Sequence, residues 1–196
     1  MKRIFTAIAL TEEIKEVLAE KEKEIQDLFP EEEARGLIKW VKKENLHITL
    51  FFLGQTPENS IEGIKKSISK IAEKPFSLKL KRIIYGPPGK TVPRLIWLEV
   101  EKKPELMRIT REMEEEFLKE RFLKKSSGRP FSPHITLGRI KTWQWKRIEP
   151  EERPQIDEDI DLNLKVESIK IMESKLKRRG PEYKILESIK LSTIAI

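Results

Sequence analysis

The chain has 196 residues with a formal net charge of +7, which favours polyanionic partners such as nucleic acid, and 37% of its residues are charged, as is typical of proteins from hot environments. The length suits one substantial domain, and the absence of cysteine excludes disulfides and thiolate metal sites and favours a cytoplasmic location. No apolar run is long enough to cross a bilayer, so we expect no membrane association.

In the first half of the chain, apolar periodicity predicts strands and helices in alternation. Thr11 can cap a first helix that ends near residue 28, and Pro57 can open a second. The predicted strands of this half are residues 2–10, 38–41, 46–53 and 76–85.

The second half begins in the same way, with a strand followed by a helix that Pro104 opens. Residues 142–161 are polar and contain prolines, so we expect them to be irregular. The predicted strands of this half are residues 94–100, 134–140, 162–172 and 183–194.

Three landmarks recur in the same order in both halves, at offsets of 91, 87 and 86 residues. They are the strand starts at Arg3 and Arg94, the histidines His47 and His134, and the segments 76–83 and 162–169. We therefore expect one domain over residues 1–196 built from two repeats, about 1–88 and 93–196. The predicted fold is α+β and bilobal with pseudo-two-fold symmetry: two mainly antiparallel sheets, helices outside and a central cleft.

The two histidines are the only ones in the chain, and each begins the tetrapeptide HITL. Side chains alternate along a strand, so His47 and Thr49 share one face, as do His134 and Thr136. The Ile and Leu of each copy face the other way and can be buried. A lone His-x-Thr is usually a packing feature, but two identical copies at matching points favour a shared site.

Such a pair suits in-line displacement at phosphorus, where the nucleophile enters opposite the leaving oxygen. Histidine titrates near neutrality, so one imidazole can take a proton while the other gives one. Each threonine hydroxyl can donate to a non-bridging phosphate oxygen. The symmetry of the sequence leaves open which histidine is the acid.

With their flanks WVKKENLHITLFFLG and RPFSPHITLGR, the motifs resemble those of the two-histidine (2H) phosphoesterases. Within that superfamily, RIFTAIAL, RLIWLEV and GPEYKIL extend the resemblance to the RNA 2′,3′-cyclic phosphodiesterases, the LigT/ThpR-like 2′–5′ RNA ligases. The resemblance implies hydrolysis of RNA 2′,3′-cyclic phosphate ends to 2′-phosphates, without metal or cofactor. It makes His134 the proton acceptor, His47 the proton donor, and Thr49 and Thr136 phosphate ligands.

Two further residues are candidates for substrate binding. Arg139 matches a family arginine at the phosphate site, but strict alternation places it opposite His134 unless the strand ends or bulges near Gly138. Phe51 shares parity with His47 and is either a base-stacking residue or an ordinary rim aromatic.

Other motifs are weaker evidence of a functional site. GPPGKT lacks the first glycine of a P-loop, and two prolines remove phosphate-binding N–H groups. Trp143 and Trp145 either contact RNA or cover a loop, and the basic run KLKRRG is either a phosphate-attracting lip or a solvated turn. Two histidines without cysteine make a metal site unfavourable.

Two other functions remain open besides hydrolysis of cyclic ends. One is 2′–5′ RNA ligation as the main role, and the other is a non-catalytic module that binds nucleotides or RNA. We expect the protein to act on its RNA as a monomer.

Overall fold

The structure is a computed structural model, which describes residues 1–29, 36–126, 128, 130–178 and 180–192. The α-helices of these residues are α1 (Glu12–Asp27), α3 (Ile61–Ser69), α4 (Pro104–Lys119) and α5 (Thr142–Trp145). Their strands are β1 (Lys2–Ala9), β2 (Ile38–Trp40), β3 (His47–Thr56), β4 (Phe76–Gly86), β5 (Leu95–Val100), β6 (His134–Ile140), β7 (Asp157–Val166), β8 (Ser168–Lys177) and β9 (Gly180–Lys190). None of the helices in these ranges is long and apolar enough to cross a membrane.

The strands form one sheet in the order β7-β4-β5-β6-β3-β1-β8-β9, with β2 beside β6. All strand pairings within the described residues are antiparallel. A single residue pair, Ile48 with Ile135, joins β3 to β6 at the centre. The two expected sheets are therefore two halves of one sheet, because β3 and β6 approach closely enough to pair once.

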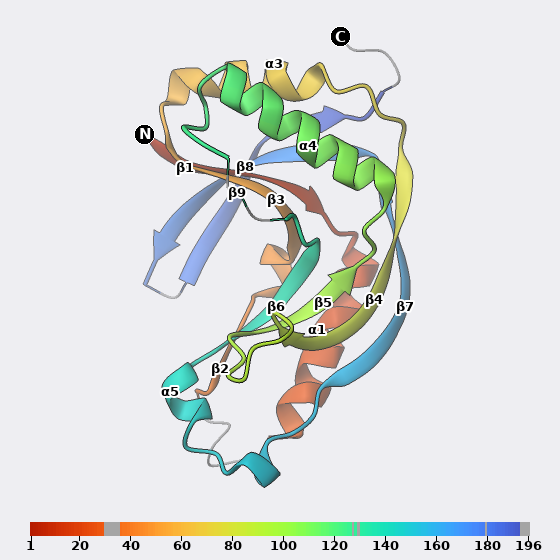
Figure 1. Ribbon diagram of the computed structural model, residues 1–196, viewed down its shortest axis with the longest axis vertical. Coiled ribbons are helices and arrows are strands. Elements are labelled where there is room, and N and C mark those ends of the chain that lie inside the picture. Colours follow the sequence, from red (N-terminus) through yellow and green to blue (C-terminus); the bar gives the residue numbers. More distant parts are fainter. Residues whose placement is uncertain (30–35, 127, 129, 179, 193–196) are drawn as a thin grey trace.

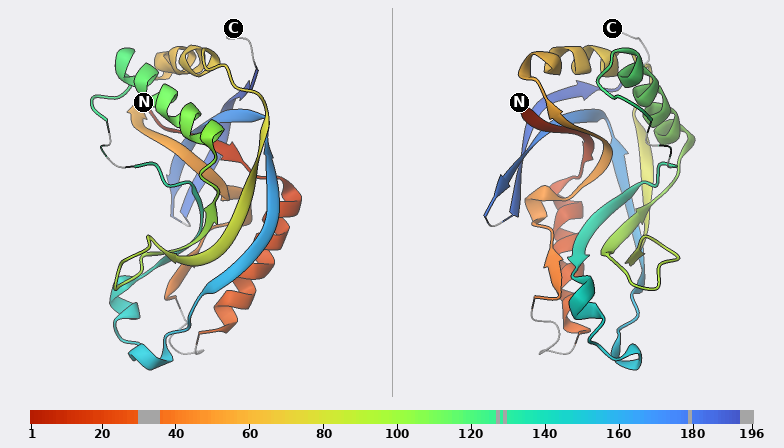
Figure 2. Two further views of the ribbon diagram at one scale, coloured as in Figure 1. Left: turned by 45° about the vertical axis from the view of Figure 1, so that its right-hand side comes forward. Right: turned by 60° about the vertical axis from the view of Figure 1, so that its left-hand side comes forward.

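The helices are divided between the two ends of the molecule (Figures 1 and 2). Helices α3 and α4 contact each other, and α3 also contacts β9. Helix α1 lies at the other end, where Lys21 forms an ion pair with Glu158 of β7 and Gln26 accepts a hydrogen bond from Trp40 of β2. Each half of the sheet thus has its own helical cover.

Each half of the sheet takes strands from both halves of the sequence. Strands β1 and β3 lie beside β8 and β9, whereas β5 and β6 lie beside β4 and β7. One landmark of the sequence comparison is therefore wrong: Leu78 and Leu164 are directly opposite partners on β4 and β7, not equivalent positions. By strand order, the counterpart of β4 is β8. The repeat boundaries themselves remain a prediction.

The core is one large cluster between the sheet and the helices. Period-two burial holds over residues 76–81 of β4, where Leu78 and Leu80 are fully buried and their neighbours are exposed. The strand predicted over residues 162–172 is wrong in its bounds. Strand β7 already starts at Asp157, and Glu167 separates its end from the start of β8. The predicted last strand ends earlier than expected, and residues 193–194 lie outside the described ranges.

Candidate active site

The two HITL segments meet where β3 and β6 cross. Ile48 and Ile135 face each other and are fully buried, whereas the histidine and threonine on either side of each are only half-buried. Because the strands are antiparallel, the register sets His47 beside Thr136 and His134 beside Thr49. All four polar side chains lie on the face opposite the core. This arrangement is the one that the repeated tetrapeptide predicts.

The two imidazoles are oriented in the same way. Nδ1 of His47 lies 2.6 Å from the carbonyl oxygen of Asn45, and Nδ1 of His134 lies 2.8 Å from that of Ser132. A carbonyl only accepts, so Nδ1 carries hydrogen in both rings and Nε2 is left for chemistry. Nε2 of His47 lies 2.8 Å from the hydroxyl oxygen of Thr49.

Aromatic side chains support both histidines. The ring of His47 lies 5.0 Å from that of Phe5 and 5.3 Å from that of Tyr183, between centroids. The His134 ring lies 4.2 Å from the indole of Trp97. Trp97 in turn rests on Gly86, where an added Cβ would come within 2.4 Å of the indole. The imidazole rings of His47 and His134 are therefore held both by these aromatic contacts and by the hydrogen bonds at Nδ1.

A β-bulge occurs at the same place in both strands. The register of β1 with β3 passes from Thr49 to Phe51 and skips Leu50, while that of β5 with β6 passes from Thr136 to Gly138 and skips Leu137. A bulge inserts one residue and reverses the alternation beyond it. Residues five positions after each histidine therefore turn back to the histidine face.

This bulge turns Arg139 to the histidine face of the sheet. Its side chain is exposed. Burial raises the pKa of Tyr183 and lowers that of His47 and of His134, and the positive charge of Arg139 acts to lower all three. The reversed alternation beyond the bulge places this charge on the side of the sheet that carries the histidines. The bulge near Gly138 that this position requires is present.

The prediction for Phe51 is wrong in its orientation. Phe51 packs against the buried Phe117 of α4, with ring centroids 5.9 Å apart, so it belongs to the core side. Phe52 lies on the histidine face instead, is 71% exposed, and has its ring centroid 5.9 Å from that of Phe5. The bulge at Leu50 causes the exchange. Phe52 and Arg139 are each five residues after their histidine. From the sequence, a bulge is considered for Arg139 alone, but a bulge at the matching point of the first copy has the same effect on Phe52.

Burial is the main influence on both histidines and lowers the pKa of each. The carbonyl contacts at Nδ1 oppose this effect and raise the pKa, while the neighbouring His134 lowers that of His47 further. The electrostatic effect of one ring on the other is consistent with a shared site. Residues that the sequence did not single out complete it: Phe5, Phe52, Trp97 and Tyr183.

The remaining sequence candidates lie elsewhere. Trp145 is buried and contacts Phe29 and Tyr85, so it covers a loop, whereas Trp143 is 56% exposed beside Arg147. The segment GPPGKT connects β4 to β5, as a turn. The basic run occupies the β8–β9 hairpin, and its Arg179 lies outside the described residues. Among the described residues, no three His, Cys, Asp or Glu side chains gather as metal ligands.

Comparisons with known proteins place this arrangement in a family. The profile described as "2'-5' RNA ligase superfamily" matches residues 16–178. A Thermotoga maritima protein named RNA 2′,3′-cyclic phosphodiesterase is 34% identical over 190 residues, covering 94% of this chain and 92% of its own. One of the same name from Methanocaldococcus jannaschii is 32% identical over 94% of this chain and 98% of its own. The chain therefore belongs to the 2′–5′ RNA ligase superfamily.

Solved structures support the same fold. The crystal structure of TT0787 from Thermus thermophilus matches with a TM-score of 0.75 and 27% identity, over 96% of this chain and 97% of that one. The structure of E. coli LigT complexed with 3′-AMP matches with a TM-score of 0.75 and 24% identity, over 97% of this chain and 98% of that one. The large antiparallel sheet and its few helices are thus the architecture of LigT-like proteins.

Proposed function

We propose that this protein hydrolyses the 2′,3′-cyclic phosphate ends of RNA to 2′-phosphates by metal-independent, two-histidine catalysis. The observation that carries the proposal is the crossing of two His-x-Thr segments at Ile48 and Ile135, with equivalent carbonyl contacts at the two Nδ1 atoms. The names of the relatives from T. maritima and M. jannaschii support the same substrate class.

In the proposed step, water attacks phosphorus from the side of His134. Neutral Nε2 of His134 takes the proton of the water as the new P–O bond forms. The P–O3′ bond breaks on the opposite side, and protonated His47 gives its proton from Nε2 to O3′. The assignment of base and acid follows the family resemblance. Thr49 and Thr136 donate hydrogen bonds to the non-bridging oxygens.

Substrate binding adjusts the protonation of the pair. In the free protein, burial and the charge of Arg139 lower the pKa of both histidines, which favours a neutral base but disfavours a charged acid. An anionic phosphate between the rings offsets the charge of Arg139. The negative charge of the phosphate raises the pKa of His47, so the acid acquires its proton when the substrate is present.

The nucleobase has an aromatic platform near His47. Phe52 is 71% exposed on the cleft side, and Phe5 and Tyr183 lie beside it around His47. Stacking of a base on such a ring contributes about 1–3 kcal/mol and tolerates different bases. We assign Phe52 to this role in place of Phe51.

One chain supplies both histidines, so a monomer is a complete catalytic unit. We infer a monomeric, cytoplasmic enzyme on that ground and on the absence of cysteine. The net charge of +7 attracts RNA through long-range steering.

The test is a panel of 2′,3′-cyclic nucleotides and of oligonucleotides with cyclic ends, with the phosphate position in each product identified by phosphorus NMR. The expected product carries a 2′-phosphate, and EDTA leaves the rate unchanged. Loss of turnover on chelation would point to a metal enzyme. Tight binding of the cyclic nucleotide without turnover over hours would favour the non-catalytic binding module.

A further inference from the structure

Arg3 is an exposed cation on the same face of the sheet as His47. Side chains alternate along β1, so Arg3 and Phe5 share one face while Ile4, between them, enters the core. The ring of Phe5 lies 5.0 Å from that of His47, between centroids, which identifies this face as the histidine face. Arg3 therefore extends the histidine face beyond the residues that surround the acid.

Arg3 lies in one row with two hydroxyl groups of the neighbouring strands. The pairing of β1 with β8 extends to Ile4, which is opposite Glu173. The next residue of each antiparallel strand places Arg3 beside Ser174. Ser174 in turn is directly opposite Tyr183 on β9. A guanidinium, an alcohol and a phenol thus follow one another across three strands.

The charged and polar groups of this row are open to an anionic ligand. Arg3 forms no ion pair among the described residues, whereas Lys2, on the opposite face of β1, is paired with Glu58. Burial raises the pKa of Tyr183, so its hydroxyl keeps its proton at neutral pH and can donate a hydrogen bond. The row therefore supplies one unpaired positive charge and a neutral donor beside it.

The in-line reaction determines on which side the rest of the RNA strand lies. Water enters from the side of His134, and the P–O3′ bond breaks towards His47. O3′ is bonded to C3′, which leads through C4′ and C5′ to the phosphate that links the terminal nucleotide to the rest of the strand. That upstream phosphate therefore lies on the His47 side of the reacting phosphorus, over the half of the sheet that contains β1, β8 and β9.

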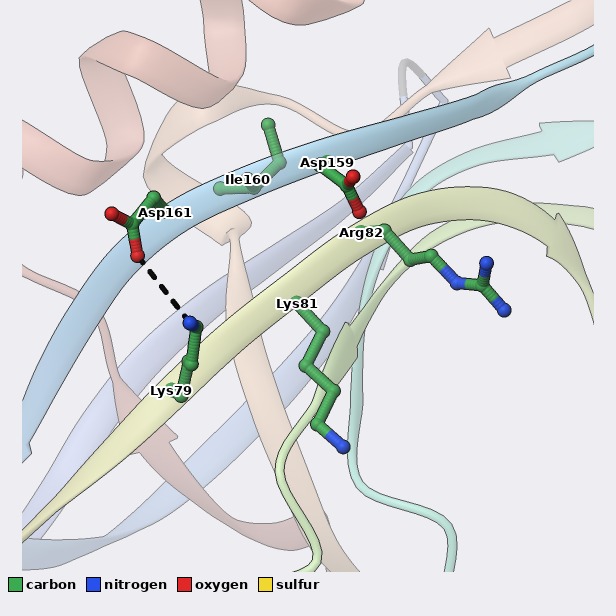
Figure 3. Close-up of a pocket in the computed structure, with 6 residues that line it drawn as sticks. All are labelled: Lys79, Lys81, Arg82, Asp159, Ile160 and Asp161. Carbon is green, nitrogen blue, oxygen red and sulfur yellow. Dashed lines mark ion pairs between the residues drawn. The ribbon is translucent and has the colours of Figure 1, made fainter.

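The other half of the sheet offers cations that carboxylates already neutralise. A hollow of about 590 Å³ lies over β4 and β7, and it is lined by Lys79, Lys81, Arg82, Asp159, Ile160 and Asp161 (Figure 3). Lys79 lies 3.6 Å from Asp161, and Arg82 lies 3.2 Å from Asp157. An RNA phosphate would have to compete with these carboxylates, whereas it meets no such competitor at Arg3.

We propose that Arg3 and Tyr183 bind the phosphate immediately 5′ of the cyclic end, so that the enzyme selects RNA strands over cyclic mononucleotides; this inference rests on the function proposed above. The guanidinium of Arg3 forms charge-assisted hydrogen bonds with this phosphate, and the Tyr183 hydroxyl donates another. The contact is made away from the reacting phosphorus, so it positions the strand and takes no part in proton transfer.

The test compares two dinucleotides that end in a 2′,3′-cyclic phosphate. The internal linkage is the natural anionic phosphodiester in one and a neutral methylphosphonate in the other, and kcat/KM is measured for both and for 2′,3′-cyclic AMP. The parent protein should prefer the anionic dinucleotide roughly tenfold or more, because the neutral linkage loses the hydrogen bonds between charged groups.

The variants assign that preference to the row. Arg3→Gln should reduce it to about twofold or less, with a smaller effect on 2′,3′-cyclic AMP, which lacks the upstream phosphate. Tyr183→Phe keeps the ring beside His47, loses only the donor, and should reduce the preference about threefold. The matched control is Lys2→Gln, which removes the same charge from the opposite face of β1 and should keep the parental preference.

Each other result overturns the inference. Equal kcat/KM for the two dinucleotides in the parent would refute the subsite while leaving the proposed function intact, whereas absence of hydrolysis with all three substrates would refute the proposed function. An equal loss on 2′,3′-cyclic AMP in Arg3→Gln would assign Arg3 to the cyclic phosphate. An equal loss of preference in Lys2→Gln would reduce the effect to general electrostatics.

Discussion

The side-chain amide of Asn45 donates a hydrogen bond to the backbone carbonyl of Pro181, 2.9 Å away. The carbonyl of the same Asn45 accepts from Nδ1 of His47 at 2.6 Å. Asn45 is buried and connects the turn end of the β8–β9 hairpin to the ring of His47. Its counterpart in the other copy, Ser132, uses only its backbone for His134 and has an exposed side chain. The two histidines therefore differ in how firmly their orienting carbonyls are anchored.

Asn45→Ala should lower kcat at least about tenfold, because the loop that carries the orienting carbonyl loses its anchor. That carbonyl raises the pKa of His47, so weakening the contact lowers the pKa. The alkaline limb of the pH–rate profile should then move to lower pH, since the acid loses its proton earlier. Ser132→Ala is the matched control and should hydrolyse like the parent. An unshifted profile in Asn45→Ala would contradict this positioning role.

Arg139→Gln should raise KM for cyclic nucleotides about tenfold or more, because a charge-assisted contact to the phosphate is lost. The charge of Arg139 lowers the pKa of both histidines, so its removal raises both. Both limbs of the profile of kcat/KM against pH should therefore move to higher pH. Arg111→Gln, on α4 beside Glu115, removes the same charge away from the cleft and should change neither quantity. A shift to lower pH in Arg139→Gln would contradict the assignment.

Phe52→Ala and Phe51→Ala should have opposite effects on binding and stability. Truncating the exposed Phe52 should raise KM about tenfold through lost base stacking and leave the melting temperature nearly unchanged. Truncating Phe51, which packs on Phe117, should destabilise the fold by about 2–4 kcal/mol with little change in KM. Steady-state kinetics and thermal melts of the two variants show which phenylalanine contributes to binding and which to stability. The reverse pattern would mean that the bulge at Leu50 is misplaced.

Glu22→Gln should stabilise the protein at alkaline pH. Burial raises the pKa of Glu22 on α1 to about 8, and its Oε1 atom has no hydrogen-bond partner among the described residues. The folded state holds this proton up to about pH 8, whereas the unfolded chain releases it near its ordinary pKa of 4.5. The wild-type protein therefore loses stability as the pH rises from 4.5 through about 8.

The melting temperature of Glu22→Gln should exceed that of the parent by a few degrees at about pH 9 and match it near pH 4. Glu20→Gln, on the exposed side of the same helix, should show no such dependence. Equal melting temperatures of Glu22→Gln and the parent under the alkaline condition would mean that Glu22 is solvated.

Much of the site could be predicted from sequence because it depends on local periodicity. Alternation along a strand is enough to place His47 with Thr49 and His134 with Thr136 on one face. The alternation fails after Thr49 and Thr136, because the bulges at Leu50 and Leu137 depend on pairing with β1 and β5. The prediction for Phe51 is wrong for that reason.

Prediction of the fold from the sequence has a similar limit. The strands and helices follow from apolar spacing, but the pairing of β4 with β7 and of β1 with β8 is non-local and leaves no mark in the sequence. Leu78 and Leu164 resemble equivalent positions because both face the core, and they are in fact neighbours. The contact of Trp97 with His134 likewise depends on strands that pair at a distance from the motif.

The central claim is that His134 and His47 act on opposite sides of one phosphorus, as base and acid. Its most direct test uses two substrates, a 2′,3′-cyclic phosphate and its analogue with sulfur at the 3′ bridging position, whose thiolate leaves without a proton. With the oxygen substrate, His47→Ala and His134→Ala should each lose about 10²–10⁴-fold in rate. With the sulfur substrate, His47→Ala should recover most of the parent rate and His134→Ala should not. Recovery in both variants or in neither, or near-parental turnover of the oxygen substrate by either, would contradict the account.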